Sequence, residues 1–124
     1  MTTGNKSILS MLASSVLLSL MACDPCSHTI KSEAVSVDRK LVARVSERNC
    51  GATTEFSSVV NVQRASDKFD PDAGVYFVAK GRYDVSAKWT GDRELLVTCS
   101  RCTRKDIFHE VAMDGDITIS YSTN

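Results

Sequence analysis

Short apolar runs with a period of two recur along most of the chain, and this pattern constrains its fold most. In residues 41–46, the side chains of Leu41, Ala43 and Val45 fall on one face, as a half-buried strand requires. The apolar spacing of three and four residues that marks an amphipathic helix does not recur. The pattern predicts an all-β fold of about seven to eight strands, as a small antiparallel meander, sandwich or open barrel. The expected strands are residues 29–36, 41–46, 56–62, 75–79, 85–89, 94–98, 107–111 and 117–121.

Turn residues separate these runs and indicate which strands pair. Asp114 and Gly115 stand between the last two runs, and Asp-Gly is a strong hairpin signal because its turn needs positive φ. We therefore expect residues 107–111 to pair with residues 117–121. The connection 67–74 is the longest and is expected to be the most mobile. The expected core consists of Leu41, Val45, Val60, Val62, Phe77, Val85, Trp89, Leu95, Val97, Ile117 and Ile119.

The N-terminus has the order of a secretory signal peptide. Lys6 precedes an apolar run, residues 8–20, which as a helix would span about 20 Å and fall short of the ~30 Å core of a bilayer. A buried core helix is the alternative, but the run has no polar face. The sequence therefore predicts a targeting segment that is removed from the mature protein.

The end of this run, Leu20-Met21-Ala22-Cys23, resembles the lipobox of bacterial lipoproteins. The resemblance implies that Cys23 receives a diacylglycerol thioether and becomes the acylated N-terminus of the mature chain, whereas an ordinary cleavage site is the alternative. Several acyl chains give stable anchoring. The expected organisation is a lipoprotein signal peptide over residues 1–22, a lipid-anchored tether over 23–28 and one β domain over 29–124.

The expected location is the bacterial cell envelope, with the membrane as partner through the lipid anchor. Asp24 resembles the signal that retains lipoproteins in the inner membrane of enteric bacteria, which favours its periplasmic face; the outer membrane is the other possibility. An envelope protein is a possible further partner. The 15 basic and 15 acidic residues cancel, so charge gives no case for nucleic-acid binding.

The chain has five cysteines. With Cys23 lipidated, four remain, and they allow three disulfide connectivities in an oxidising compartment. We favour Cys26–Cys50, which would staple the tether to the sheet, together with Cys99–Cys102.

The C-x-x-C segment also allows a redox pair, with its thiol pKa lowered by nearby basic residues, but it follows a strand rather than opening a helix. Two C-x-x-C pairs fit the sequence pattern of a four-cysteine zinc site, namely Cys23 with Cys26 and Cys99 with Cys102. The two pairs lie too far apart for a zinc ribbon, and lipid would block Cys23. We expect no metal, no cofactor and no catalytic residues. The basic residues beside the C-x-x-C are Arg101, Arg104, Lys105 and His109.

Small and hydroxyl residues cluster after the second expected strand. They favour either a tight connection, fixed by a glycine and a disulfide, or a loop that contacts a ligand through backbone amides and hydroxyls. The candidate ligand residues are Arg48, Asn49, Gly51, Thr53 and Thr54.

Two motifs resemble an uncharacterised family of small bacterial exported proteins. Residues 36–43, Ser-Val-Asp-Arg-Lys-Leu-Val-Ala, are similar to its S-P-D-G-K-x-x-A, with Val37 and Arg39 replacing the proline and the glycine. Residues 48–54 are similar to its R-[DN]-C-G-A-T-T, and residues 89–95 and 117–121 fit its later parts. The resemblance implies export but no known activity.

The function expected from the sequence is a lipid-anchored, non-enzymatic binding or structural module of the envelope. One alternative is a thiol-disulfide or redox-sensing protein that uses Cys99 and Cys102. Another is a small periplasmic hydrolase inhibitor that projects a loop into a foreign active site.

Overall fold

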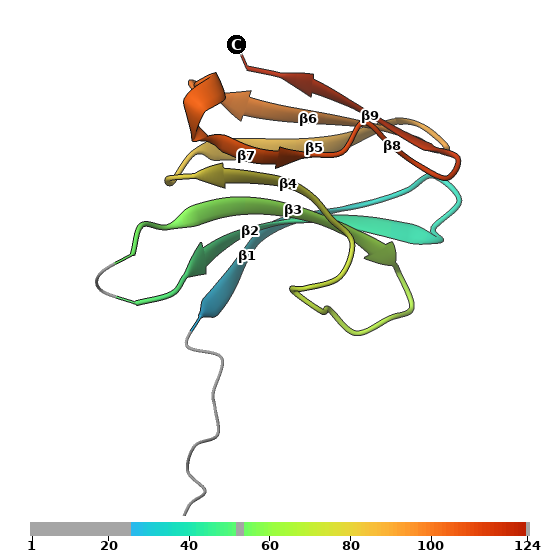
Figure 1. The fold of residues 1–124 in the computed structure, drawn as a ribbon. Coiled ribbons are helices and arrows are strands. Elements are labelled where there is room, and N and C mark those ends of the chain that lie inside the picture. Colours follow the sequence, from blue (N-terminus) through green and yellow to red (C-terminus); the bar gives the residue numbers. More distant parts are fainter. Residues whose placement is uncertain (1–25, 52–53, 124) are drawn as a thin grey trace, which may run out of the picture.

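The computed structural model describes residues 26–51 and 54–123, which form a two-layered β sandwich (Figure 1). The all-β prediction is confirmed, as nine strands in two sheets. Sheet A has the order β1-β2-β3-β4-β7, with β1 (Ser27–Val35), β2 (Leu41–Asn49), β3 (Ser57–Arg64), β4 (Val75–Lys80) and β7 (Ile107–Glu110). Sheet B has the order β5-β6-β9-β8, with β5 (Asp84–Gly91), β6 (Glu94–Ser100), β9 (Ile117–Ser122) and β8 (Met113–Asp114). The 3-10 turn η2 (Arg104–Asp106) leads into β7. Among the described residues, no helix is long and apolar enough to cross a membrane.

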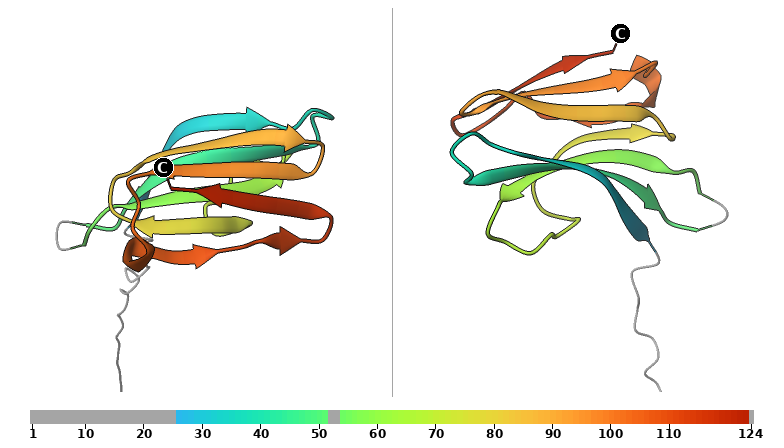
Figure 2. Two further views of the ribbon diagram at one scale, coloured as in Figure 1. Left: turned by 90° about the horizontal axis from the view of Figure 1, so that it is seen from above. Right: turned by 180° about the vertical axis from the view of Figure 1, so that it is seen from behind.

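Consecutive antiparallel pairing builds sheet A from β1 to β4, and β7 adds its last strand (Figure 2). β1 begins two residues earlier than expected. Ser27 and His28, which were expected to belong to the tether, already pair with Asn49 and Arg48. The disulfide between Cys26 and Cys50 lies directly beyond this pair and holds the strand ends together.

The expected pairing of residues 107–111 with 117–121 is wrong. β7 joins β4 in sheet A, where Phe77 lies opposite Glu110. The chain then crosses to sheet B around Val111, whose N–H donates to the carbonyl oxygen of Tyr76. Only two residues remain for β8, so the Asp-Gly turn joins β8 to β9. β9 then lies between β8 and β6. It is antiparallel to β8 and parallel to β6.

The core lies between the inner faces of the sheets. Its largest fully buried side chains include Phe77, Leu95, Val60 and Val97, all expected from the alternation. Leu41 and Trp89 are only partly buried and pack against the core from its border. Trp89 belongs there because its indole N–H needs an acceptor, and it donates to the carbonyl oxygen of Ala34 over 2.8 Å.

Two tyrosines stabilise the segment that crosses from sheet A to sheet B. The Tyr121 ring stacks on Phe77 with centroids 5.7 Å apart, and its hydroxyl accepts from the Val111 N–H. Burial raises the pKa of Tyr121 to about 12, so the hydroxyl stays a donor to the backbone. Tyr76 donates to Asp114 over 2.6 Å, and burial, then that carboxylate, hold its pKa above the usual range.

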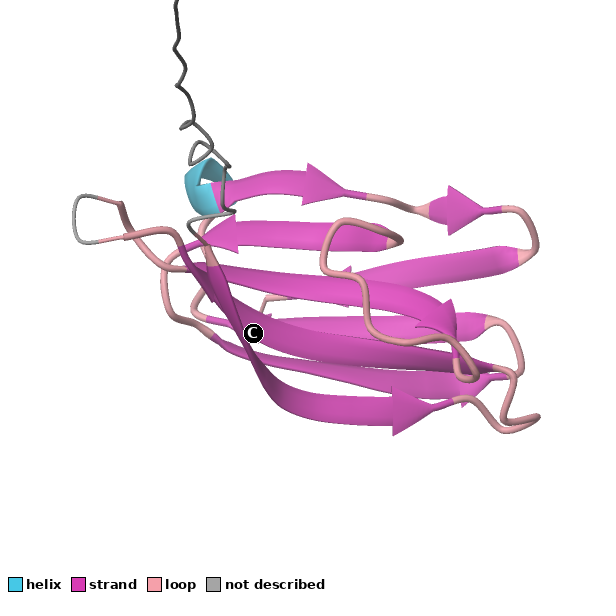
Figure 3. Ribbon diagram, turned by 90° about the horizontal axis from the view of Figure 1, so that it is seen from below, coloured by secondary structure: helices cyan, strands magenta, loops and turns pink. Residues whose placement is uncertain are grey.

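The long connection 65–74 lies against the outer face of sheet A rather than projecting freely (Figure 3). Asn61, which is buried, donates to the carbonyl oxygens of Pro71 and Ala73 over 3.2 and 2.9 Å. Gln63 donates to Asp70 and Ala73. These amide contacts satisfy carbonyl groups of the loop and hold it against sheet A.

Both favoured cysteine pairs are formed. The Cα atoms are 3.8 Å apart for Cys26 and Cys50, and 5.6 Å apart for Cys99 and Cys102. The two disulfides lie at the same end of the sandwich, where β1 begins and β6 ends; we call it the disulfide end.

Candidate functional site

The end of the sandwich opposite the disulfides, which we call the Arg93 end, is organised by one arginine. Arg93 lies in the turn between β5 and β6, and its Nη2 lies 2.8 Å from Asp38 Oδ2 in the β1–β2 turn. Its Nε lies 3.7 Å from Asp116 Oδ2 in the β8–β9 turn. The guanidinium thus links three turns that come from both sheets, and its hydrogen bond holds the pKa of Asp38 well below the usual range.

Hydrogen bonds fix the β1–β2 turn that faces Arg93. The buried Ser36 donates from its hydroxyl to Asp38 Oδ1 over 2.8 Å and accepts from the Leu41 N–H over 3.0 Å. The Lys40 N–H donates to the same Asp38 oxygen over 3.0 Å. The backbone that carries Arg39 and Lys40 is therefore preorganised.

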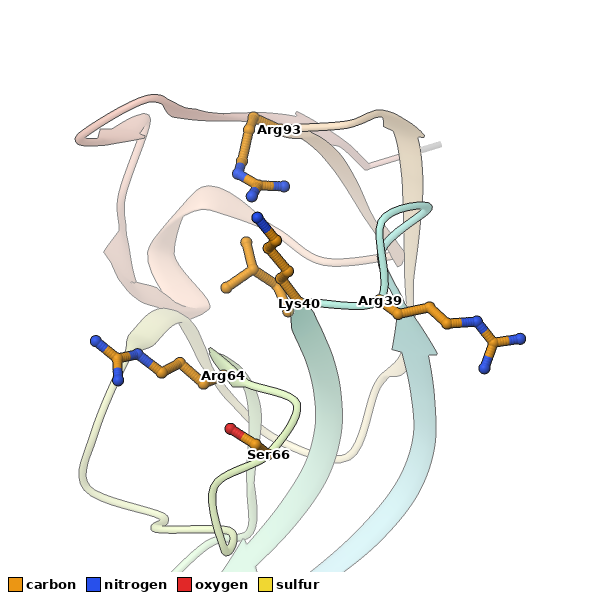
Figure 4. A pocket seen from close by; sticks show the side chains of 6 residues that line it. Arg39, Lys40, Arg64, Ser66 and Arg93 are labelled. Carbon is orange, nitrogen blue, oxygen red and sulfur yellow. The ribbon is translucent and has the colours of Figure 1, made fainter.

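A shallow cavity of about 460 Å³ opens between these turns (Figure 4). In Figure 4 the side chains of Lys40 and Arg93 point toward each other, whereas Arg39 points away. Arg93 is paired, but within the described part of the chain no carboxylate lies at ion-pairing distance from Arg39, Lys40 or Arg64. The residues that line the cavity are Arg39, Lys40, Leu41, Arg64, Ser66 and Arg93.

Asp38 and Asp116 compensate the charge of Arg93, so the positive charge left at the cavity is that of Arg39, Lys40 and Arg64, and a bound anion would neutralise it. Leu41 and the aliphatic stems of the longer side chains supply apolar wall, and the Ser66 hydroxyl supplies a further donor. The cavity is therefore suited to an anionic group that carries an apolar body. Within residues 26–51 and 54–123, no three His, Cys, Asp or Glu side chains gather as metal ligands would.

Arg39 has a backbone conformation that its side chain disfavours. Its φ is 65°, in the left-handed region that glycine adopts without cost. A residue with a Cβ costs about 1 kcal/mol there. Strained residues of this kind cluster at functional sites, which favours a role for the arginine beyond folding.

The loop predicted to contact a ligand lies at the other end, and its described polar groups bind one another. The Gly51 N–H donates to Asn49 Oδ1 over 3.1 Å, and Thr54 donates from its N–H and its hydroxyl to the Gly51 carbonyl oxygen over 3.2 and 3.1 Å. Arg48 is exposed in β2, and Thr53 lies outside the described residues. These bonds fit a tight connection.

Cys99 and Cys102 are both buried, and both belong to the core cluster. Sulfur atoms that exchange disulfides need access for an attacking thiolate. The position of this pair fits a structural clip better than a redox site.

The cavity was not predicted from the sequence. Its lining comes from residues 39–41, 64–66 and 93, which belong to three separate turns or strand ends. The indication of this cavity in the sequence is the pair of adjacent basic residues Arg39 and Lys40 in a predicted turn.

Comparisons of the chain with models of protein families, with curated proteins and with solved structures give no match.

Proposed function

We propose that the protein is a lipid-anchored, non-enzymatic binding module of the bacterial envelope. Its site is the cavity at the Arg93 end, and its ligand is an anionic group attached to an apolar body. The observation that carries this proposal is the convergence of Lys40 and Arg93 at a cavity that Leu41 also lines, with no carboxylate of the described chain on Lys40.

The position of the cavity supports a module that reaches away from its anchor. The lipobox-like segment ends at Cys23, three residues before the disulfide end. β1 has nine residues and runs from that end to the turn that lines the cavity, so it separates the two by about 30 Å. A domain anchored through Cys23 holds the cavity away from the bilayer, where an envelope partner can reach it.

Phenyl phosphate is a probe with the charge and the apolar body that the cavity requires. We expect it to bind the mature protein more tightly than phenol or inorganic phosphate, because only phenyl phosphate uses both the cations and the apolar wall. Lys40→Gln is expected to weaken binding about tenfold, since it removes a charge-assisted hydrogen bond. Titration calorimetry measures both effects.

Lys68→Gln is the matched control because it removes the same charge from the neighbouring exposed loop. It should leave the affinity for phenyl phosphate within about twofold of wild type. Equal losses for Lys40→Gln and Lys68→Gln would show general electrostatic attraction and contradict the assigned site.

The lipid anchor has a separate test. Cells that make the Cys23→Ser chain are expected to accumulate the unprocessed precursor, because the modification needs the thiol of that residue. Radiolabelled palmitate should enter wild type and the Cys26→Ser chain, but not Cys23→Ser. Labelling of all three chains, or of none, would count against the anchor.

A further inference from the structure

We propose that the disulfide end of the domain lies on the surface of an anionic bilayer, through Arg48, Arg101, Lys105 and Phe108. This orientation rests on the lipid anchor of the proposed function. Two residues lie between Cys23 and Cys26, so the Cα atoms of the two cysteines are at most about 11 Å apart. The disulfide end is therefore held close to one Debye length from the lipid headgroups, where surface charge acts on it.

Contacts within the described chain place these residues at one end. Ser57 pairs with Arg48 in β2 and with Lys80 in β4, and Ala79 pairs with Ile107 at the start of β7. Asp84 pairs with Ser100 in sheet B. Figure 1 shows η2 at the same end as the start of β1.

Uncompensated positive charge distinguishes this end. Arg48, Arg101 and Lys105 are exposed, and none has a carboxylate of the described chain at ion-pairing distance. Most carboxylates nearby are engaged: Glu55 lies 2.9 Å from Lys80 Nζ, and Glu110 holds Arg104 through two hydrogen bonds. Glu47 pairs with Lys31 and Arg82, whereas Asp106 accepts hydrogen bonds from the neutral hydroxyls of Tyr83 and Thr103 and keeps its negative charge. Asp84 and Asp106 therefore oppose the three cations Arg48, Arg101 and Lys105.

An aromatic side chain accompanies these cations. Phe108 in β7 is 64% exposed and lies beside Lys80 at the mouth of a second surface cavity. Aromatic rings next to basic side chains are favoured at the interface between lipid and water. An anionic lipid surface fits this combination, because it offers phosphate charge and an apolar layer directly beneath it.

Arg101, like Arg39, has a positive φ angle, which its side chain disfavours. Its φ is 67°, and these two arginines are the described residues other than glycine with positive φ. Arg101 lies in the tight segment closed by Cys99 and Cys102, in a conformation that glycine adopts without cost. An arginine in its place adds an exposed cation at the face that we assign to the membrane.

Lysine acetylation of the lipidated protein in vesicles tests this orientation. One set of vesicles contains phosphatidylcholine with three tenths phosphatidylglycerol, and the other contains phosphatidylcholine alone. We expect the acetylation rate of Lys105, relative to that of Lys68 at the far end, to fall roughly fivefold in the anionic vesicles. A concentration of 1 M salt should restore the ratio, because it shortens the Debye length to about 3 Å.

Two variants with the same chemical change provide the control. Arg101→Gly should restore much of the Lys105 rate without destabilising the fold, whereas Arg39→Gly should leave the ratio unchanged. An equal Lys105 to Lys68 ratio in both vesicle types, with the protein floating on each, overturns the orientation while the anchor stands. Failure to float with either vesicle type overturns the anchor itself.

Discussion

Phe77→Ala is expected to lower the free energy of unfolding by about 3–5 kcal/mol, because it leaves a cavity at the centre of the sandwich. Phe77 is 1% exposed, and its ring stacks on Tyr121, so the substitution also removes the contact that joins β4 to β9. This loss is a large share of the roughly 5–15 kcal/mol by which a native domain is stable. At roughly 4–8 °C per kcal/mol, it also lowers the melting temperature by more than about 10 °C. Thermal and urea unfolding, followed by circular dichroism, measure it.

Phe108→Ala is the matched control because it removes the same side chain from a 64% exposed position. We expect it to change the free energy of unfolding by less than about 0.5 kcal/mol. Comparable losses for Phe77→Ala and Phe108→Ala would contradict the placement of the core between the two sheets.

Gly74→Ala is expected to destabilise the protein by about 3 kcal/mol, and the reason lies in the backbone. A Cβ at Gly74 would come 2.1 Å from the carbonyl oxygen of Val62, so either the loop or β3 has to move. The positive φ of 64° adds strain. The movement would break the hydrogen bond from the Val62 N–H to the Gly74 oxygen and loosen the loop that Asn61 and Gln63 hold.

Gly115→Ala is the control that distinguishes the steric clash of an added Cβ from the strain of a positive φ. Gly115 has nearly the same φ, 61°, but a Cβ at this position would have no other atom within 4 Å. We expect this variant to cost only about 1 kcal/mol. Denaturant unfolding of the two variants gives the difference, and equal costs would show that the loop does not pack against Val62 as described.

Local patterns predicted the strands well because the side-chain period of a strand is two, and burial alternates with that period in β5, β6 and β9. Residues 41–46 and 85–89 lie inside β2 and β5, and the Asp114-Gly115 turn is present. Pairing was harder to predict. The turn signal specifies a hairpin but not the length of its first strand, and β7 gains more by completing sheet A beside β4 than by extending that hairpin.

The cavity could not be derived from the sequence, because its parts meet only when the sandwich forms. Arg64 ends β3 and Arg93 follows β5, and nothing in either local sequence refers to the turn at Arg39. The cysteine pairs could be derived, because few connectivities exist and each favoured pair spans a short segment or adjoining strand ends.

The interior position of β9, the parallel neighbour of β6, determines when sheet B can be completed. β9 follows the other strands of sheet B in the sequence but lies inside the sheet, between β6 and β8. Ile117 and Ile119 therefore reach the core only after the other strands of sheet B have been synthesised. Until then, sheet B lacks an interior strand, and its hairpin β5–β6 has little independent stability. For a protein that is exported as we propose, this order leaves sheet B incomplete until β9 is made, which favours a chain that is still unfolded when export begins.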